Sequence, residues 1–136
     1  MDAQIRVFIS QMELGTPTTA DAINIAGEQL GISLPDQYKE FMIETNGAEG
    51  FVGVNSYLAI WPIDQIVQLN DEYAVKEFTP GLVYFGSDGG GMAYAFDCRD
   101  EITSIVEFPF ESIDVEDARS CGRTFNEFMQ NLYSRT

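Results

Sequence analysis

Apolar residues at helical spacing open the chain. They recur every three or four positions up to Gly15, which predicts an amphipathic helix over residues 2–14. After a Thr-Pro break, Thr18 and Asp21 fit a capping box. The same spacing predicts a second helix over residues 18–30.

A third helix is expected from Pro35, because proline at the first helical position has no amide donor to lose and its φ already suits the helix. Tyr38 and Phe41 share its apolar face. Asn46-Gly47 closes it, since glycine enters the left-handed region without a Cβ clash.

The period changes after Gly50, where runs of apolar residues are shorter and are separated by turn residues. Strands are predicted over residues 57–61, 82–87, 92–97 and 102–108. Short connections between the last three strands favour antiparallel hairpins. A helix is expected over Ile63–Tyr73, a loop over Pro109–Ala118, and a last helix from Thr124.

Helices that precede and follow a run of hairpin strands are typical of an α+β fold. We therefore expect residues 1–136 to form a single domain: a largely antiparallel sheet with helices packed mainly on one side. No repeat, low-complexity stretch or Pro/Ser-rich linker divides the chain, and its length suits one core.

Composition removes most catalytic chemistry. The chain has no histidine, so Ser-His-Asp and Cys-His nucleophile systems are excluded. Cys98 and Cys121 without histidine do not complete a zinc site. We expect no catalytic residues, no metal and no cofactor, and hence no enzyme. The alternative of hydrolysis by paired carboxylates has no spacing to support it among 22 acids.

The N-terminus carries an acid where a secretory signal would carry Lys or Arg, and no apolar signal core follows. The expected location is the cytoplasm, where both cysteines would be reduced thiols. No apolar run is long enough to suggest a membrane span.

The net charge of −15 is unevenly distributed. Residues 64–117 hold thirteen acids against two bases, whereas residues 118–136 hold one acid against three arginines. This field opposes direct binding to nucleic acid or to an anionic membrane, and it would attract a basic protein. The alternative is that the charge serves solubility alone.

Two features are candidates for binding. The run Gly86–Gly91 is expected to be a hairpin turn, because it lacks the lysine and hydroxyl of a phosphate loop. Trp61 ends a predicted strand, where its ring either joins the core or anchors a partner. The residues expected to meet a protein partner are Trp61, Asp88, Tyr94, Asp97, Asp100, Glu111, Asp114, Glu116 and Asp117.

Several short motifs, in order, resemble the SUKH superfamily over residues 18–135. The structural residues that carry the resemblance are Leu34, Pro35, Tyr38, Phe41, Asn46 and Gly47, then Gly86, Gly89, Gly90 and Gly91, and finally Phe125 and Phe128. The superfamily includes a fungal cell-wall-synthesis regulator and many bacterial immunity proteins.

The resemblance implies a domain without known catalytic residues, often encoded beside a secreted toxin that it neutralises by binding. The expected function is therefore immunity to a basic toxin domain. The alternative is an intracellular regulatory or scaffolding module of the same fold without a toxin partner, because fold does not dictate function.

Overall fold

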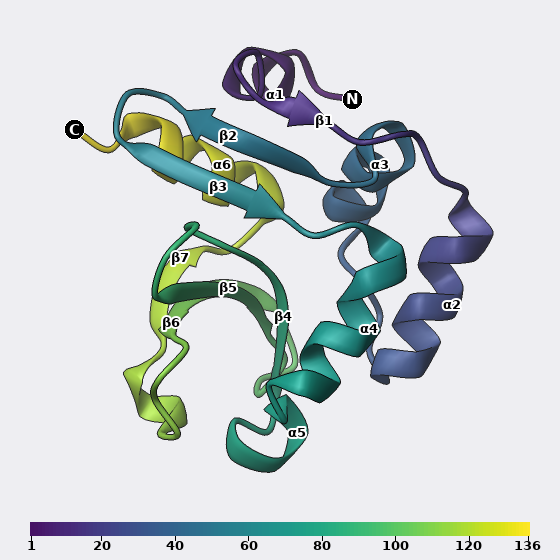
Figure 1. Ribbon diagram of the computed structural model, residues 1–136, viewed down its shortest axis with the longest axis vertical. Coiled ribbons are helices and arrows are strands. Elements are labelled where there is room, and N and C mark those ends of the chain that lie inside the picture. Colours follow the sequence, from purple (N-terminus) through teal and green to yellow (C-terminus); the bar gives the residue numbers. More distant parts are fainter.

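A computed structural model describes residues 1–136 (Figure 1). The helices are α1 (Ala3–Phe8), α2 (Ala20–Leu30), α3 (Asp36–Thr45), α4 (Ile63–Glu72), α5 (Val75–Phe78), the 3₁₀ turn η1 (Val115–Asp117) and α6 (Phe125–Ser134). The strands are β1 (Glu13–Leu14), β2 (Ala48–Val52), β3 (Ser56–Ile60), β4 (Leu82–Ser87), β5 (Met92–Asp97), β6 (Ser104–Pro109) and β7 (Arg119–Gly122). None of the helices is both long enough and apolar enough to cross a membrane.

The strands form one antiparallel sheet in the order β1 to β7, so each strand pairs with its sequence neighbours. Figure 1 shows the helices around this strongly bent sheet, with α6 behind β2 and β3. The main core contains residues from α1, α2, α3, α4 and α6 and from one face of the sheet. The expected α+β class, with helices mainly on one side, is confirmed.

An aromatic cluster fills the main core. Tyr38 of α3 lies edge-on to Phe96 and Phe85, with ring centroids 4.9 and 5.8 Å apart. Phe125 and Phe128 of α6 complete the cluster. Rings in these tilted arrangements add to the hydrophobic stabilisation from burial, so the predicted motif residues hold α3, α6 and the sheet together.

Asn46 joins two helices. It ends α3 in the left-handed conformation, with φ 45° and ψ 48°, and its side-chain oxygen accepts a hydrogen bond of 2.8 Å from the amide of Ile63. The Ile63 amide lies in the first turn of α4, where backbone amides have no carbonyl acceptor within the helix. Gly47 follows with φ 103° and lies against the backbone of Ile60. The predicted close of the third helix is confirmed, although Asn46 takes the cap position.

Asn70 of α4 substitutes for a missing strand beside β4. Strand β3 pairs with β4 only through Ala59 and Ile60. Tyr84 pairs with Ala95 of β5, but on its other side it has no strand partner. The Asn70 amide donates to the Tyr84 carbonyl at 2.8 Å, and its oxygen accepts from the Tyr84 amide at 2.9 Å. A buried backbone pair is thereby satisfied by a side chain.

The expected helix over residues 2–14 is wrong in its second half. The helix ends at Phe8, and Glu13–Leu14 instead form β1 against β2. The apolar residues of the expected helix, Ile5, Phe8, Ile9 and Met12, are still buried, because the turn after α1 keeps the last two facing the core. Strand β2 was not expected, since two of its three inward positions, Ala48 and Gly50, carry little or no side chain and only Val52 is a larger apolar residue.

Smaller departures concern element ends. Thr19, not Thr18, caps α2 by accepting from the amide of Ala22 at 3.2 Å, and Pro35 caps α3 from one position outside the helix. Strand β7 was also missed, because Cys121 is its one buried residue. The remaining predicted helices and strands are found within about two residues, which is the usual uncertainty of element ends.

Candidate functional site

The sheet has an outer face, turned away from the main core. On β2 and β3 this face presents Glu49, Phe51, Tyr57 and Ala59, none of them buried. The Phe51 side chain is 48% exposed and lies edge-on to Tyr57, with ring centroids 5.4 Å apart. This end of the outer face is therefore open and partly aromatic.

On β4, β5 and β6 the outer face carries a second, smaller core. Its members are Val75, Leu82, Tyr84, Ala93, Ala95, Val106 and Phe108. Short segments cover it: α5 supplies Val75, and the segment 110–118 supplies Phe110 and Val115. Since no long helix covers this side, the residues at its margin stay partly exposed.

Three rings form an aromatic row at that margin: Trp61, Tyr73 and Phe110. Tyr73 lies between the other two, with its ring centroid 6.3 Å from Trp61 at 9° and 4.7 Å from Phe110 at 26°. Tyr73 is 44% exposed, whereas its two neighbours are half-buried. The row is a nearly parallel stack with solvent access at its centre.

Backbone contacts fix the row. The amide of Trp61 donates to the carbonyl of Phe85 at 3.0 Å, and the amide of Phe110 donates to the carbonyl of Gly91 at 2.9 Å. Tyr73 is the C-cap of α4. Each ring thus sits at the end of a strand or helix, as rigid binding residues do.

Acids lie on the open strands and next to Phe110 in the sequence. Glu13 pairs with Glu49 across β1 and β2, and Glu111 follows Phe110. The Tyr57 hydroxyl donates a short hydrogen bond to Glu49, and this bond raises the pKa of Tyr57. The face can therefore attract a cation by charge and hold it over aromatic rings.

Most Lys and Arg side chains form ion pairs away from the open strands and the aromatic row. Ion pairs join Arg6 to Glu44, Lys39 to Asp36, Arg99 to Asp97, and Arg135 to Glu107. Lys76, Arg119 and Arg123 have no carboxylate within 4.0 Å. None of the three belongs to the open strands or the aromatic row.

Of the predicted partner residues, Trp61 lies in the aromatic row, whereas Asp88 lies in the turn between β4 and β5. Asp88 is half-buried, and its carboxylate accepts from the amides of Gly90 and Met92, which orders the turn beside Phe110. Gly89 has φ 80° in this turn. The expected hairpin turn is confirmed, with Asp88 as a turn-forming residue.

Tyr94 and Asp97 are not free surface groups. Tyr94 is 2% exposed and packs against Phe128 of α6, with ring centroids 5.0 Å apart. Asp97 is 9% exposed and accepts two side-chain bonds from Arg99, at 2.9 and 2.7 Å. These bonds hold the pKa of Asp97 below its usual range. Both residues are structural here, which corrects the expectation that they form a contact surface.

The remaining predicted acids are exposed, but only some of their carboxylates are free of hydrogen bonds and ion pairs. Asp114 caps η1 through the amide of Glu116, and Asp117 accepts from a serine hydroxyl. Glu116 lies 4.0 Å from Arg99. Asp100 and Glu111 have no hydrogen bond or ion pair with other side chains, so these two are the free members of the predicted acidic surface.

Sequence reasoning missed Tyr73 and Phe110. Tyr73 lies at the end of a predicted helix and Phe110 in a predicted loop, so neither belonged to a periodic pattern. Phe110 could have been suspected from the sequence, because it is an aromatic residue in an acidic loop and aromatic side chains are enriched at interfaces.

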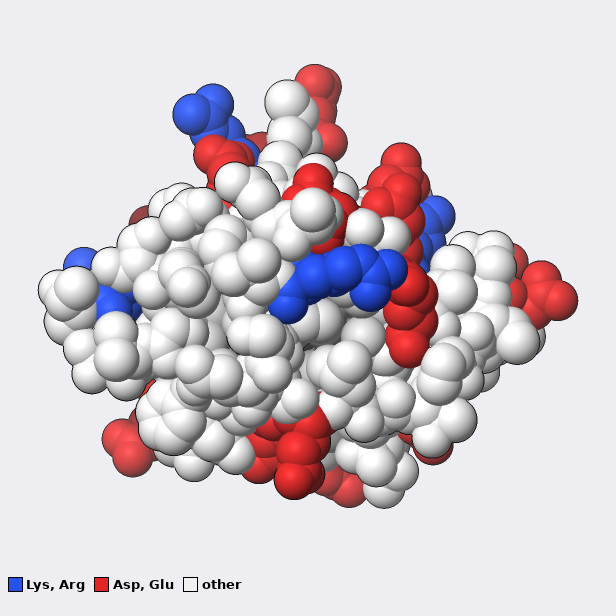
Figure 2. Space-filling model, turned by 90° about the horizontal axis from the view of Figure 1, so that it is seen from above, with Lys and Arg blue, Asp and Glu red and all other residues white.

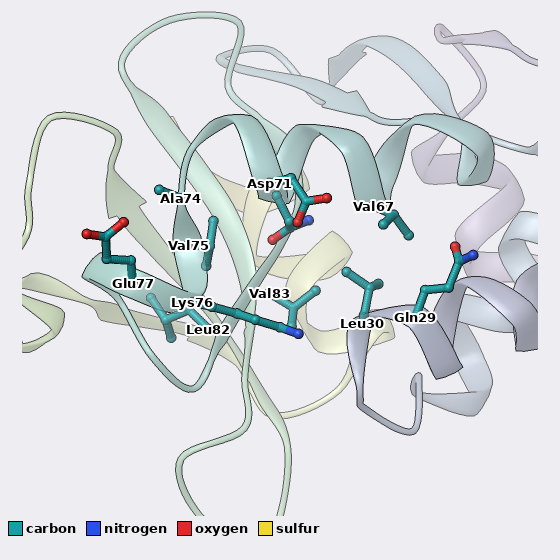
Figure 3. A pocket seen from close by; sticks show the side chains of 11 residues that line it. Gln29, Leu30, Val67, Asp71, Ala74, Val75, Lys76, Glu77, Leu82 and Val83 are labelled. Carbon is teal, nitrogen blue, oxygen red and sulfur yellow. The ribbon is translucent and has the colours of Figure 1, made fainter.

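A pocket of about 270 Å³ lies between α2, α4, α5 and β4 (Figure 3). Leu30, Val67 and Val83 form part of its apolar lining, and Lys76 lies along one side. Asp71 and Glu77 also line it, so its charges favour no single class of ligand. No group of three or more Cys, Asp and Glu residues is placed to hold a metal ion.

Both cysteines are free thiols. Cys121 is buried, and burial raises its pKa to about 11. Cys98 is half-buried with a raised pKa for the same reason. Thiols in this state are poor nucleophiles near neutral pH.

Comparison with known proteins matches residues 17–131 to the model of the SMI1 / KNR4 family (SUKH-1). The chain belongs to this family. The match covers α2 through most of α6, including the aromatic row. The family resemblance expected from the sequence is therefore confirmed.

A relative in Bacillus subtilis (strain 168), the uncharacterized protein YnaB, is 28% identical over 120 residues. The aligned region covers 87% of this chain and 78% of YnaB. The relative's description assigns no activity, so function rests on the family and on the geometry of this chain.

Proposed function

We propose that this SUKH-1 protein is an immunity protein that binds and neutralises a basic toxin domain, without catalysing a reaction. The observation that carries the proposal is Tyr73, which is 44% exposed at the centre of the aromatic row. Asp71 and Glu72 precede it in the sequence, and Glu111 follows Phe110. Family membership supports a protein partner, and the charge of −15 supports a basic one.

The aromatic row would supply affinity. Tyr and Trp are enriched among the few residues that dominate binding energy, because they bury a large rigid surface at low entropic cost. A Lys or Arg side chain of the partner would gain about 0.5–2 kcal/mol over any ring face of the row that the neighbouring rings leave open.

The acids would raise the association rate and would select a basic partner. Glu111 and Asp100 are free to act on an approaching positive charge, and a concentrated field raises association rates by roughly 10- to 1000-fold at low salt. An acidic nucleic acid would be repelled by the same field. The arrangement thus favours a basic protein over a nucleic acid.

The test uses whichever toxin domain a neighbouring gene encodes. Cells that express the toxin domain should grow when this chain is co-expressed, and the purified proteins should bind. Replacing Tyr73 with Lys should weaken binding at least about tenfold and abolish protection. The matched control is Ile25→Lys, which adds the same charge at a 54% exposed residue of α2.

Two results would contradict the proposal. Equal effects of Tyr73→Lys and Ile25→Lys would remove the aromatic row as the binding face. Binding without growth protection would indicate a regulatory or scaffolding module instead of an immunity protein.

A further inference from the structure

The outer face of β2 and β3 is uncovered. Figure 1 shows α6 behind these two strands and no element in front of them. Side chains alternate along a strand, so Tyr57, Ala59 and Trp61 project from the same face of β3 and its end. At about 3.3 Å per residue, Tyr57 lies about 13 Å along the strand from Trp61. The aromatic row and the open strands are therefore two parts of one face.

Two acids stand opposite each other at the open end of this face. Glu13 and Glu49 are register partners across β1 and β2, and both are exposed. No Lys or Arg nitrogen lies within 4.0 Å of either carboxylate. Figure 2, seen from the side of α1 and β1, shows acids at its lower edge without Lys or Arg beside them. Like charges directly opposite in a sheet are unfavourable, so a positive charge from outside would relieve the pair.

The Glu49 carboxylate is held in place before any partner arrives. Its Oε2 accepts the hydroxyl bond from Tyr57, whereas its Oε1 accepts no hydrogen bond. The Tyr57 ring is fixed in turn, because Phe51 lies edge-on to it and Gly89 lies so close that a Cβ there would be 2.8 Å from a ring carbon. A preorganised acceptor binds with less loss of entropy.

Small residues separate Tyr57 from the aromatic row. Ala59 pairs with Ser87 across β3 and β4, and the turn after Ser87 ends at Gly91, whose carbonyl accepts from the amide of Phe110. Gly91 is exposed, its φ is not in the left-handed region, and a Cβ on it would meet no atom within 4 Å. The fold therefore does not require a glycine at position 91, whereas the close approach of another chain does.

We propose that this face binds an extended, arginine-bearing segment of the basic partner, with one arginine at Glu13 and Glu49 and a second basic side chain at the aromatic row. The inference rests on the proposed function, because it names the kind of segment that the same face takes. A guanidinium carries five donors in a rigid fork, so it can bond both carboxylates at once. Phe51 is 48% exposed and offers apolar surface to the arginine stem.

The segment is extended because of the spacing on β3. Two side chains four residues apart on an extended chain are about 13 Å apart, which matches the span from Tyr57 to Trp61. Its backbone then passes over the small residues between them. The net charge of −15 favours such a basic segment at long range.

A side chain added at position 91 tests the close approach. Gly91→Leu should leave the urea midpoint of the free chain unchanged or raise it, because the Cβ meets no neighbour and glycine loses more entropy on folding. The dissociation constant for the toxin domain should rise at least about tenfold. Asn24→Leu adds the same side chain at an exposed position of α2 and should bind as the wild type does.

Removal of one opposing charge tests the acid pair. Glu13→Gln should leave the urea midpoint unchanged or raise it, because the repulsion within the free chain is relieved. It should nevertheless weaken binding about tenfold at physiological salt, where charges further apart than about 8 Å are screened. Glu28→Gln removes the same charge from an exposed position of α2 and should change binding less than about twofold. In an arginine-to-glutamine scan of the toxin domain, one variant should bind this chain and Glu13→Gln equally.

The outcomes separate this inference from the proposed function. A wild-type chain that binds no toxin domain overturns the proposed function, and the inference with it. Binding that Tyr73→Lys weakens but Gly91→Leu and Glu13→Gln leave unchanged overturns the inference alone. Equal losses for Glu13→Gln and Glu28→Gln also overturn it, because they show a general effect of charge. A lower urea midpoint for Glu13→Gln overturns it as well, because the acid would then support the fold.

Discussion

Replacing Asn70 with Ala removes the side chain that substitutes for a strand beside β4. The variant leaves the buried amide and carbonyl of Tyr84 without their partners, which lie at 2.9 and 2.8 Å in the wild type. Each orphaned buried group costs about 1–3 kcal/mol. Asn70 also lines the pocket beneath α5, so water can reach part of the gap. We therefore expect a loss of about 2–4 kcal/mol in the free energy of unfolding.

Urea denaturation followed by circular dichroism measures this loss. With a slope of about 2 kcal/mol/M, the middle of the range for a small protein, the midpoint should fall by about 1–2 M. The control is Gln68→Ala on the same helix, which breaks an exposed bond to Glu72 and should change stability by less than about 0.5 kcal/mol. A loss below about 1 kcal/mol for Asn70→Ala would refute the idea that this side chain completes the sheet edge.

Three further substitutions test the packing and charge arguments. Gly47→Ala should cost about 1–3 kcal/mol in denaturation, because a Cβ at φ 103° would lie 2.8 Å from the carbonyl oxygen of Ile60. A midpoint equal to wild type would remove this argument. Tyr38→Phe should leave the free energy of unfolding unchanged or raise it by up to about 1 kcal/mol, because the buried Tyr38 hydroxyl has no hydrogen-bond partner; a clear loss of stability would reveal an unseen partner. Asp97 has a pKa below its ordinary value of 3.8, so its contribution is complete above that value and disappears as the pH falls through the folded pKa. The difference in stability between wild type and Arg99→Ala should therefore shrink in acid, and a difference independent of pH would contradict the pairing.

The periodic elements could be predicted because local sequence determines them. Helices α2, α3, α4 and α6 each carry a buried stripe, and strands β4, β5 and β6 are short, mostly buried runs; a short window displays both patterns. Strands β2 and β7 could not be predicted in this way. Their inward positions include Gly50 and a single Cys121, and they are strands because their neighbours offer a free edge.

The candidate site depended on tertiary contacts. Trp61 could be singled out before folding was known, but its neighbours Tyr73 and Phe110 come from a helix end and a loop that meet only in the folded chain. The same limit applies to the acids. Asp97 has the sequence context of a surface carboxylate, and it is buried because Arg99, two residues away, folds back onto it.

Trp61 is the chain's single tryptophan and lies in the aromatic row, so its fluorescence reports on the proposed binding face. The most direct measurement is acrylamide quenching of Trp61 in the free chain and in complex with a tryptophan-free version of the toxin domain. The account predicts that the complex shields Trp61, and that Tyr73→Lys, at equal concentrations, removes the shielding together with the binding. A complex that forms while Trp61 is quenched as strongly as in the free chain would contradict the claim that the partner binds at the aromatic row.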